Sequence, residues 1–150
     1  MQVVAALIES EGKLLVCRRR RDSKFGALKW EFPGGKAEPG ETPEQALERE
    51  LREELGIETQ IGAEVYRTRH AYAEPTGAIE LLFFAVRIRG NTPRNLVFEE
   101  IVWCEAGSLE KLDFLPADRE LIDKLACGSL ILPPVEGRTR ATSPAGRASR

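Results

Sequence analysis

Residues 34–57 read GGKAEPGETPEQALERELREELGI, and the interpretation of the whole chain starts from this stretch. Thr42 is followed by Pro43 and then, three positions after the threonine, by Gln45. This order is typical of an N-cap, a proline in the first helical turn and the partner of a capping box. Gly56 supplies the left-handed residue that commonly ends a helix. We therefore expect an α-helix of about three and a half turns between these two signals.

The expected helix, Pro43–Leu55, gathers its acidic residues on one face. At roughly 100° per residue its leucines form an apolar stripe, and an adjacent face carries three glutamates, Glu50, Glu53 and Glu54. Like charges three and four residues apart cost an isolated helix a few tenths of a kcal/mol each, roughly. Most such charge runs are solvated helix faces. The more specific interpretation is that a cation compensates the three carboxylates.

A hard divalent cation fits the residues around these glutamates. Such an ion binds oxygen atoms from carboxylates, backbone carbonyls and phosphates. Gly34 and Gly35 allow the backbone to approach closely enough to lend a carbonyl or to shape a phosphate site. Arg49 can hold one of the carboxylates in a fixed orientation through a bidentate pair. The sequence therefore predicts a metal and phosphate site formed by these three glutamates and the glycine loop before the helix.

Size and composition indicate one domain that does not need disulfide bonds or a structural metal ion for its stability. The chain has 150 residues, a mass of 16.7 kDa and a net charge of −2, so no strong nucleic-acid binding is expected. Its three cysteines have no metal-ligand spacing, and an odd number argues against a disulfide framework, which favours the reducing cytoplasm. No secretory leader and no apolar run of membrane-spanning length is recognisable, so no membrane partner is expected.

Alternating and apolar runs predict two hairpins. Residues 2–9 and 13–18 are β-rich and flank a turn, and residues 57–73 and 78–89 form a second pair with a turn at 74–77. Within the last run, residues 81–86 are almost continuously apolar. We expect this segment to be a strand buried on both faces, in the centre of the domain.

The remaining segments are shorter. Residues 30–33 predict a short strand that leads to the glycines, residues 99–104 predict another strand, and Arg119–Leu125 predicts a second helix. Asp118 precedes that helix in the position of an N-cap. Residues 1–128 are expected to form the domain, and residues 129–150, rich in proline, glycine, serine and arginine, a flexible basic tail.

Basic residues near the glycines are candidates for substrate binding. Four arginines follow one another at 18–21, at the end of a predicted strand, and successive strand residues point to opposite faces. Such a run is usually a solvated edge. Because this strand leads directly towards the glycines, Arg19 and Arg20 are candidate contacts for substrate phosphate, together with Lys36.

Two motifs flank the helix and carry a resemblance to a known family. WEFPGGK (30–36) runs directly into the spacing of Gly35, Glu41 and the segment REXXEEXG at 49–56, and LPAD (115–118) opens the last helix. With these motifs the chain resembles the Nudix hydrolase superfamily and, within it, the MutT-like enzymes, over residues 2 to 127. The resemblance implies a fold of the α/β (α+β) class, an α/β/α sandwich with a central mixed β-sheet and the Nudix box as loop-helix-loop.

The resemblance also implies an activity and the residues that perform it. Nudix hydrolases cleave a nucleoside diphosphate linked to another group, with Mg²⁺ or Mn²⁺ as cofactor, and MutT-like enzymes convert a nucleoside triphosphate to the monophosphate and pyrophosphate. By position, Glu50, Glu53 and Glu54 are the implied metal ligands, with Glu50 also as the base. Gly34 or Gly35 adds a carbonyl, while Glu41 and Arg49 hold the acidic side chains in place.

The preferred base stays open. The position of Asp118 lies near the base in the subgroup, and MutT has an asparagine there. An ionised aspartate only accepts hydrogen bonds, whereas a protonated one both donates and accepts. 8-oxo-dGTP, CTP and methylated cytosine nucleotides therefore all remain possible, as does a simple helix cap at Asp118. A further departure is Val97, where many relatives carry a metal-binding glutamate that Glu99 or Glu100 would have to replace.

The leading hypothesis is a pyrophosphohydrolase that removes oxidised purine nucleotides such as 8-oxo-dGTP, a role in nucleotide-pool sanitation and DNA repair. A CTP-type pyrophosphohydrolase is the nearest rival, followed by a dinucleotide or ADP-sugar hydrolase. A non-catalytic module that recognises oxidised bases is a hypothesis of a different class, weakened by the intact set of glutamates. Because of the basic tail, weak contact with nucleic acid remains possible. Both a monomer and a homodimer are compatible with the sequence.

Overall fold

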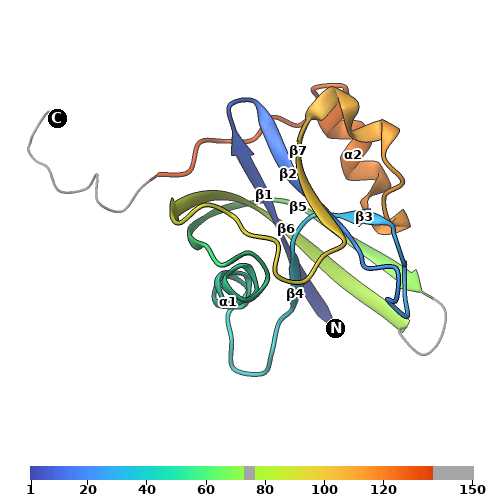
Figure 1. The fold of residues 1–150 in the computed structure, drawn as a ribbon, viewed down its shortest axis with the longest axis horizontal. Coiled ribbons are helices and arrows are strands. Elements are labelled where there is room, and N and C mark those ends of the chain that lie inside the picture. Colours follow the sequence, from blue (N-terminus) through green and yellow to red (C-terminus); the bar gives the residue numbers. More distant parts are fainter. Residues whose placement is uncertain (73–76, 137–150) are drawn as a thin grey trace, which may run out of the picture.

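The computed structural model describes residues 1–72 and 77–136, and a mixed β-sheet forms the middle layer (Figure 1). Its seven strands are β1 (Gln2–Ser10), β2 (Lys13–Arg18), β3 (Trp30–Glu31), β4 (Gly34–Lys36), β5 (Glu58–Tyr72), β6 (Gly77–Gly90) and β7 (Glu100–Glu105). They hydrogen-bond in the order β3-β2-β1-β6-β5, with β4 added to β1 and β7 added to β2. β1 and β6 are parallel and the other pairs are antiparallel, which confirms the predicted mixed sheet.

Two α-helices cover opposite faces of this sheet. They are α1 (Pro43–Leu55) and α2 (Arg119–Ala126), and two short 3-10 helices, η1 (Ala106–Lys111) and η2 (Pro116–Asp118), precede α2. In Figure 1, α1 and α2 lie on either side of the strands. The predicted α/β/α sandwich is therefore confirmed. Within the described residues, no helix has the length and apolar character needed to cross a bilayer.

Alternation along the two central strands divides the core into two layers. On β1, Val4, Ala6 and Ile8 pack with the leucines of α1, whereas Ala5 and Leu7 pack with those of α2. The same alternation holds along β6, where residues 81–86 are all buried. A strand that is apolar on both faces stabilises both helices. The prediction of a central strand buried on both sides is confirmed.

Both hairpins form as predicted. β1 and β2 pair next to a turn in which Glu11 and Gly12 have φ values of 53° and 80°, a conformation that suits a two-residue turn. β5 and β6 pair over most of their length. The turn expected at 74–77 lies largely outside the described residues, which omit 73–76.

The segment after α2 continues to pack against the domain. Leu130 and Leu132 lie against the core layer that contains α2, and a Cβ atom added at Gly62 would come within 2.9 Å of the Val135 side chain. Close packing therefore extends past residue 128, where the sequence suggested a boundary. The rest of the expected tail, residues 137–150, lies outside the described residues.

α1 begins and ends at the residues that the sequence indicates. The Thr42 hydroxyl accepts from the Gln45 backbone N–H at 3.1 Å, and the Gln45 side chain accepts from the Thr42 N–H at 2.9 Å, which completes a capping box. Gly56 is left-handed, with φ 66°, and its N–H bonds to the Arg52 carbonyl. These local bonds set the position of every side chain on the helix.

We expect Thr42→Ala to lower the free energy of unfolding by about 1 kcal/mol, because it removes the hydroxyl that satisfies a helical N–H. Thr42→Ser keeps that hydroxyl and is the matched control. Urea denaturation of both variants measures the difference. If serine costs as much stability as alanine, the cap does not supply the stabilisation.

Candidate active site

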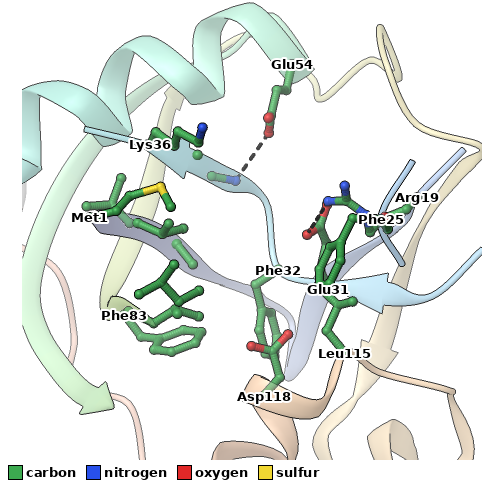
Figure 2. A pocket seen from close by; sticks show the side chains of 17 residues that line it. Met1, Arg19, Phe25, Glu31, Phe32, Lys36, Glu54, Phe83, Leu115 and Asp118 are labelled. Atoms are coloured by element: carbon green, nitrogen blue, oxygen red, sulfur yellow. Dashed lines mark hydrogen bonds and ion pairs between the residues drawn. The ribbon is translucent and has the colours of Figure 1, made fainter. Parts of the chain in front are cut away.

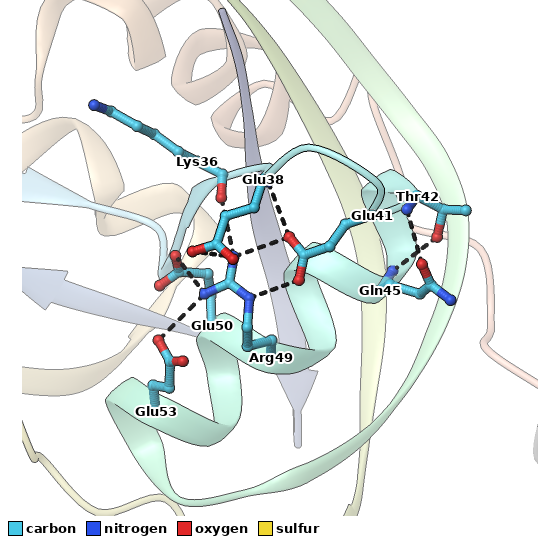
Figure 3. A network of polar contacts seen from close by, with 8 residues as sticks. All are labelled: Lys36, Glu38, Glu41, Thr42, Gln45, Arg49, Glu50 and Glu53. Carbon is cyan, nitrogen blue, oxygen red and sulfur yellow. Dashed lines mark hydrogen bonds and ion pairs between the residues drawn. The ribbon is translucent and has the colours of Figure 1, made fainter.

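Arg49 joins acidic residues of the loop before α1 to those in the second half of the helix (Figure 3). Its Nε and Nη2 donate to the two Glu41 oxygens at 2.7 and 3.1 Å, and Nη2 also donates to the Lys36 carbonyl at 3.1 Å. Nη1 donates to Glu50 Oε2 at 3.2 Å and to Glu53 Oε1 at 3.3 Å. One guanidinium thus joins the loop after β4 to two of the predicted ligands, and the supporting role of Arg49 and Glu41 stays a prediction.

Glu50 and Glu54 form the centre of the acidic site. The pKa of each is raised above its ordinary value, and the hydrogen bond between the two carboxyl groups favours the proton on Glu54 over Glu50. Burial is the largest cause of a raised pKa in both, and for Glu54 the charge of Glu50 adds to it. Two carboxyl groups share a proton in this way because both cannot ionise at close range without a cation.

The glycine loop closes over these carboxyl groups from the other side. The Gly34 N–H donates to Glu54 Oε1 at 3.2 Å, and a Cβ atom added at Gly35 would overlap the Glu50 carboxyl group. A side chain at Gly34 would in turn overlap the Val4 carbonyl of β1. Both glycines therefore allow the backbone of the loop to lie directly against the carboxyl groups of Glu50 and Glu54. Carboxylate and backbone carbonyl oxygens are the ligands that Mg²⁺ and Mn²⁺ prefer.

Glu53 takes a different position from the other two glutamates. Its side chain is 58% exposed and contacts Arg49. Among residues 1–72 and 77–136, no three acidic, histidine or cysteine side chains are already gathered around one point. The structure thus brings Glu50 and Glu54 together, and Glu53 as a metal ligand stays a prediction.

A cavity of about 510 Å³ opens beside this acidic pair (Figure 2). Gly34, Gly35, Lys36 and Glu54 line one part of it, and Asp118 lies on the opposite side. Between them the walls are largely apolar, with aromatic rings from Phe25, Phe32 and Phe83. Its volume and its mixture of apolar walls with a few polar groups are those of a site for a small organic ligand.

Asp118 belongs to this cavity. Of the two roles that the sequence left open for Asp118, the helix cap is not formed, because its side chain makes no cap hydrogen bond to α2. The residue ends η2 in a helical conformation and is only 3% exposed. Burial, with a smaller contribution from the charge of Glu31, raises the pKa of Asp118 to about 8. At neutral pH its carboxyl group is therefore largely protonated and can both donate and accept.

Glu31 also lines the cavity, besides Glu54 and Asp118, and the sequence did not single it out. Arg19 Nη1 donates to both of its oxygens at 3.1 Å. Burial raises the pKa of Glu31, and the Arg19 charge opposes that shift. The only available signal was its place in WEFPGGK. Residue type alone did not distinguish it from a surface glutamate on a short strand.

The candidate substrate-binding residues occupy different environments. Arg19 and Lys36 line the cavity, whereas Arg20 is exposed and pairs with Asp22 at 3.2 Å, outside the lining residues. Their contacts with substrate stay predictions.

The structure also places the residues near the expected additional metal ligand. Val97 is 41% exposed. Glu99 binds Arg21 at 2.8 Å, Glu100 binds Arg18 at 3.3 Å, and neither glutamate is among the residues that line the cavity.

Known proteins are similar to this chain in sequence. A family model described as the NUDIX domain matches residues 1–125. The chain is 38% identical over 125 residues to an 8-oxo-dGTP diphosphatase of Haemophilus influenzae, covering 83% of this chain and 90% of that protein. It is 39% identical over 123 residues to a CTP pyrophosphohydrolase of Escherichia coli, covering 82% and 89%.

Solved structures give the same result. The solution structure of the E. coli ORF135 protein superimposes with a TM-score of 0.71 at 37% identity, covering 97% of this chain and 94% of that one. The sequence motifs, the α/β/α sandwich and the family match over residues 1–125 agree. On this evidence the chain is a hydrolase that belongs to the Nudix family.

Proposed function

We propose that this protein is a metal-dependent pyrophosphohydrolase that cleaves nucleoside triphosphates to the monophosphate and pyrophosphate. One observation carries the proposal. The Glu50 and Glu54 carboxyl groups meet the glycine loop at one side of a cavity whose opposite side holds the buried Asp118. The first group of residues suits a metal and phosphates, and the apolar space between suits a base.

The residues at the acidic side fit Mg²⁺ or Mn²⁺. Glu50, Glu53 and Glu54 would hold the ion, with a carbonyl from Gly34 or Gly35. A divalent ion there neutralises phosphate charge and makes bound water more acidic. Arg49 keeps Glu50 oriented through its 3.2 Å contact, and Glu41 in turn fixes Arg49. We assign to Glu50 the role of the base, whose carboxylate oxygen accepts the proton of the attacking water. We assign phosphate binding to Lys36.

The other side of the cavity favours a base that is rich in N–H donors. The carboxyl groups of Glu31 and Asp118 both line it. Oxidised guanine presents N–H groups on both its pyrimidine and its imidazole edge, and carboxylate oxygens accept from such groups. We therefore name 8-oxo-dGTP as the leading substrate, a reaction we place in the cytoplasm. The name of the Haemophilus influenzae relative is in line with this choice.

CTP is the second candidate, and the state of Asp118 favours it. A protonated carboxyl group donates to one ring nitrogen and accepts from the neighbouring amine, which matches the N3 and N4 edge of cytosine. The pKa of Asp118, raised by burial to about 8, keeps that proton in place at neutral pH. The name of the Escherichia coli relative points the same way.

We expect the preference between the two bases to depend on pH. As pH rises from 6.5 to 9, Asp118 loses its proton and becomes an acceptor only, so kcat/KM for 8-oxo-dGTP should rise about tenfold relative to CTP. Pyrophosphate release with Mg²⁺, measured across a panel of oxidised and normal triphosphates, gives both the ratio and its pH dependence.

Asp118→Asn is the control for that experiment. An amide does not titrate in this range, so the ratio should stay nearly constant in the variant. An equally steep change in the variant would exclude Asp118 as its source. No pyrophosphate release from any nucleotide would contradict the proposed function as a whole.

A further inference from the structure

Arg19 contacts two different groups of the cavity wall, the carboxyl group of Glu31 and the segment that carries Phe25. Nη1 donates to both oxygens of Glu31, each at 3.1 Å, and Nε donates to the Phe25 carbonyl at 2.9 Å. The guanidinium also lies over the Phe25 ring, 5.8 Å from its centroid. Figure 2 shows the three side chains together at the edge of the cavity. One residue therefore holds both a carboxylate and an aromatic ring.

The loop that carries Phe25 depends on such support. Residues 19–29 connect β2 to β3, and within them Leu28 has φ 62°, a conformation that costs a residue with a side chain about 1 kcal/mol or more. The Leu28 N–H donates to the Arg19 carbonyl at 3.1 Å, and its own carbonyl accepts from Arg18 Nε at 3.1 Å. The arginine end of β2 therefore stabilises an otherwise unfavourable loop.

The same loop is held close to the far wall of the cavity. A Cβ atom added at Gly26 would lie 2.6 Å from a methyl group of Leu115 and 3.4 Å from the Arg19 side chain. Leu115, like Phe25, lines the cavity, and Phe25 is 40% exposed there. The loop thus has a defined position from which its aromatic ring faces the space assigned to the base.

We propose that Arg19 is a positioning residue for base binding, which ties Phe25 and Glu31 together so that the base meets an aromatic face and a hydrogen-bonding carboxylate at once. This inference rests on the proposed function. Two donor nitrogens of Arg19 are already engaged by protein groups, which distinguishes it from Lys36 on the acidic side of the cavity. Arg19 therefore acts on the base through its neighbours.

Arg19→Lys tests the proposal with little risk to the fold. Lysine keeps a charge for Glu31 but has no planar fork to donate to Phe25 at the same time. We expect KM for the preferred nucleoside triphosphate to rise about tenfold, while kcat stays within about twofold of the wild-type value. The reason is that a contact to the base is lost, whereas the contacts to the reacting phosphates are kept. With 2-deoxyribose 5-triphosphate, which lacks the base, KM should be unchanged.

Arg67→Lys is the matched control, because Arg67 also forms a bidentate pair with a glutamate, Glu64, at 2.7 and 2.8 Å, but outside the lining residues. It should leave both KM values unchanged. Equal KM values for Arg19→Lys and Arg67→Lys would overturn the proposal. A wild-type protein that cleaves no triphosphate at all would instead contradict the proposed function.

Two further measurements separate positioning from general destabilisation. Phe25→Leu should raise KM for the nucleotide, but not for the triphosphate without a base, because aromatic stacking on the base is lost. Limited trypsin digestion should cut the 19–29 loop, which besides position 19 contains Arg20, Arg21, Lys24 and Lys29, several-fold faster in Arg19→Lys than in Arg67→Lys. Equal cleavage rates would show that Arg19 does not hold the loop.

Discussion

Glu54→Gln is expected to lower turnover at least 100-fold, roughly, while the protein still folds. Glutamine has nearly the same shape as the protonated glutamic acid that the structure places against Gly34 and Glu50, so packing is retained. What it cannot provide is a negative charge when a cation binds. A single electrostatic group at a reacting centre contributes about 3 to 4 kcal/mol to the transition state, which corresponds to the expected loss.

The measurement is pyrophosphate release at saturating Mg²⁺ and saturating nucleotide, together with thermal unfolding of the same samples. Glu58→Gln is the matched control, since Glu58 is an exposed glutamate just after α1 that pairs with Arg52. It should keep full turnover. Near-normal turnover of Glu54→Gln at saturating Mg²⁺ would contradict the assignment of Glu54 as a ligand. The unfolding curve shows whether a loss of turnover is instead caused by a loss of folding.

The parts of the fold that the sequence predicted are those set by local signals. The bounds of α1 follow from a capping box and a left-handed glycine, each of which acts within four residues. The central strand β6 was predicted because an almost continuously apolar run is typical of a strand buried on both faces, and the structure pairs it in parallel with β1. In both cases the physical cause lies inside the segment itself.

The parts that the sequence left open or missed depend on contacts between distant segments. For Asp118 both a base contact and a helix cap remained possible, because the cap pattern is local, and only the fold shows that the residue lines the cavity without a cap hydrogen bond. Arg19 was a candidate for phosphate, and its partner Glu31 becomes visible only when β2 and β3 pair. Glu53 shares its spacing with two buried glutamates but contacts Arg49 on the exposed side. Residue type and spacing do not encode such pairings.

Asp118→Asn is expected to make the protein more stable at high pH. Burial first, and the charge of Glu31 second, raise the pKa of Asp118 from 3.8 to about 8 in the folded state. The folded protein therefore binds this proton more tightly than the unfolded chain does. Its contribution to the free energy of unfolding is fully present below pH 4 and is lost as pH rises towards 8. An amide removes that dependence.

The two proteins should have similar stability at pH 4, and at pH 9 the variant should be more stable by up to about 6 kcal/mol, since the shift is about four pKa units and each corresponds to about 1.4 kcal/mol. Glu31 and Glu54 also have raised pKa values, so both proteins keep a residual slope, and only the difference between them reports on Asp118. Urea denaturation in one buffer series from pH 4 to 9 measures it. Asp113→Asn, which removes an exposed carboxylate paired with Lys29, corrects for the change in net charge. If the free energy of unfolding changes with pH in the same way for wild type and Asp118→Asn, the Asp118 carboxyl group has an ordinary pKa inside the cavity. The expected change of base preference with pH would then have no physical cause.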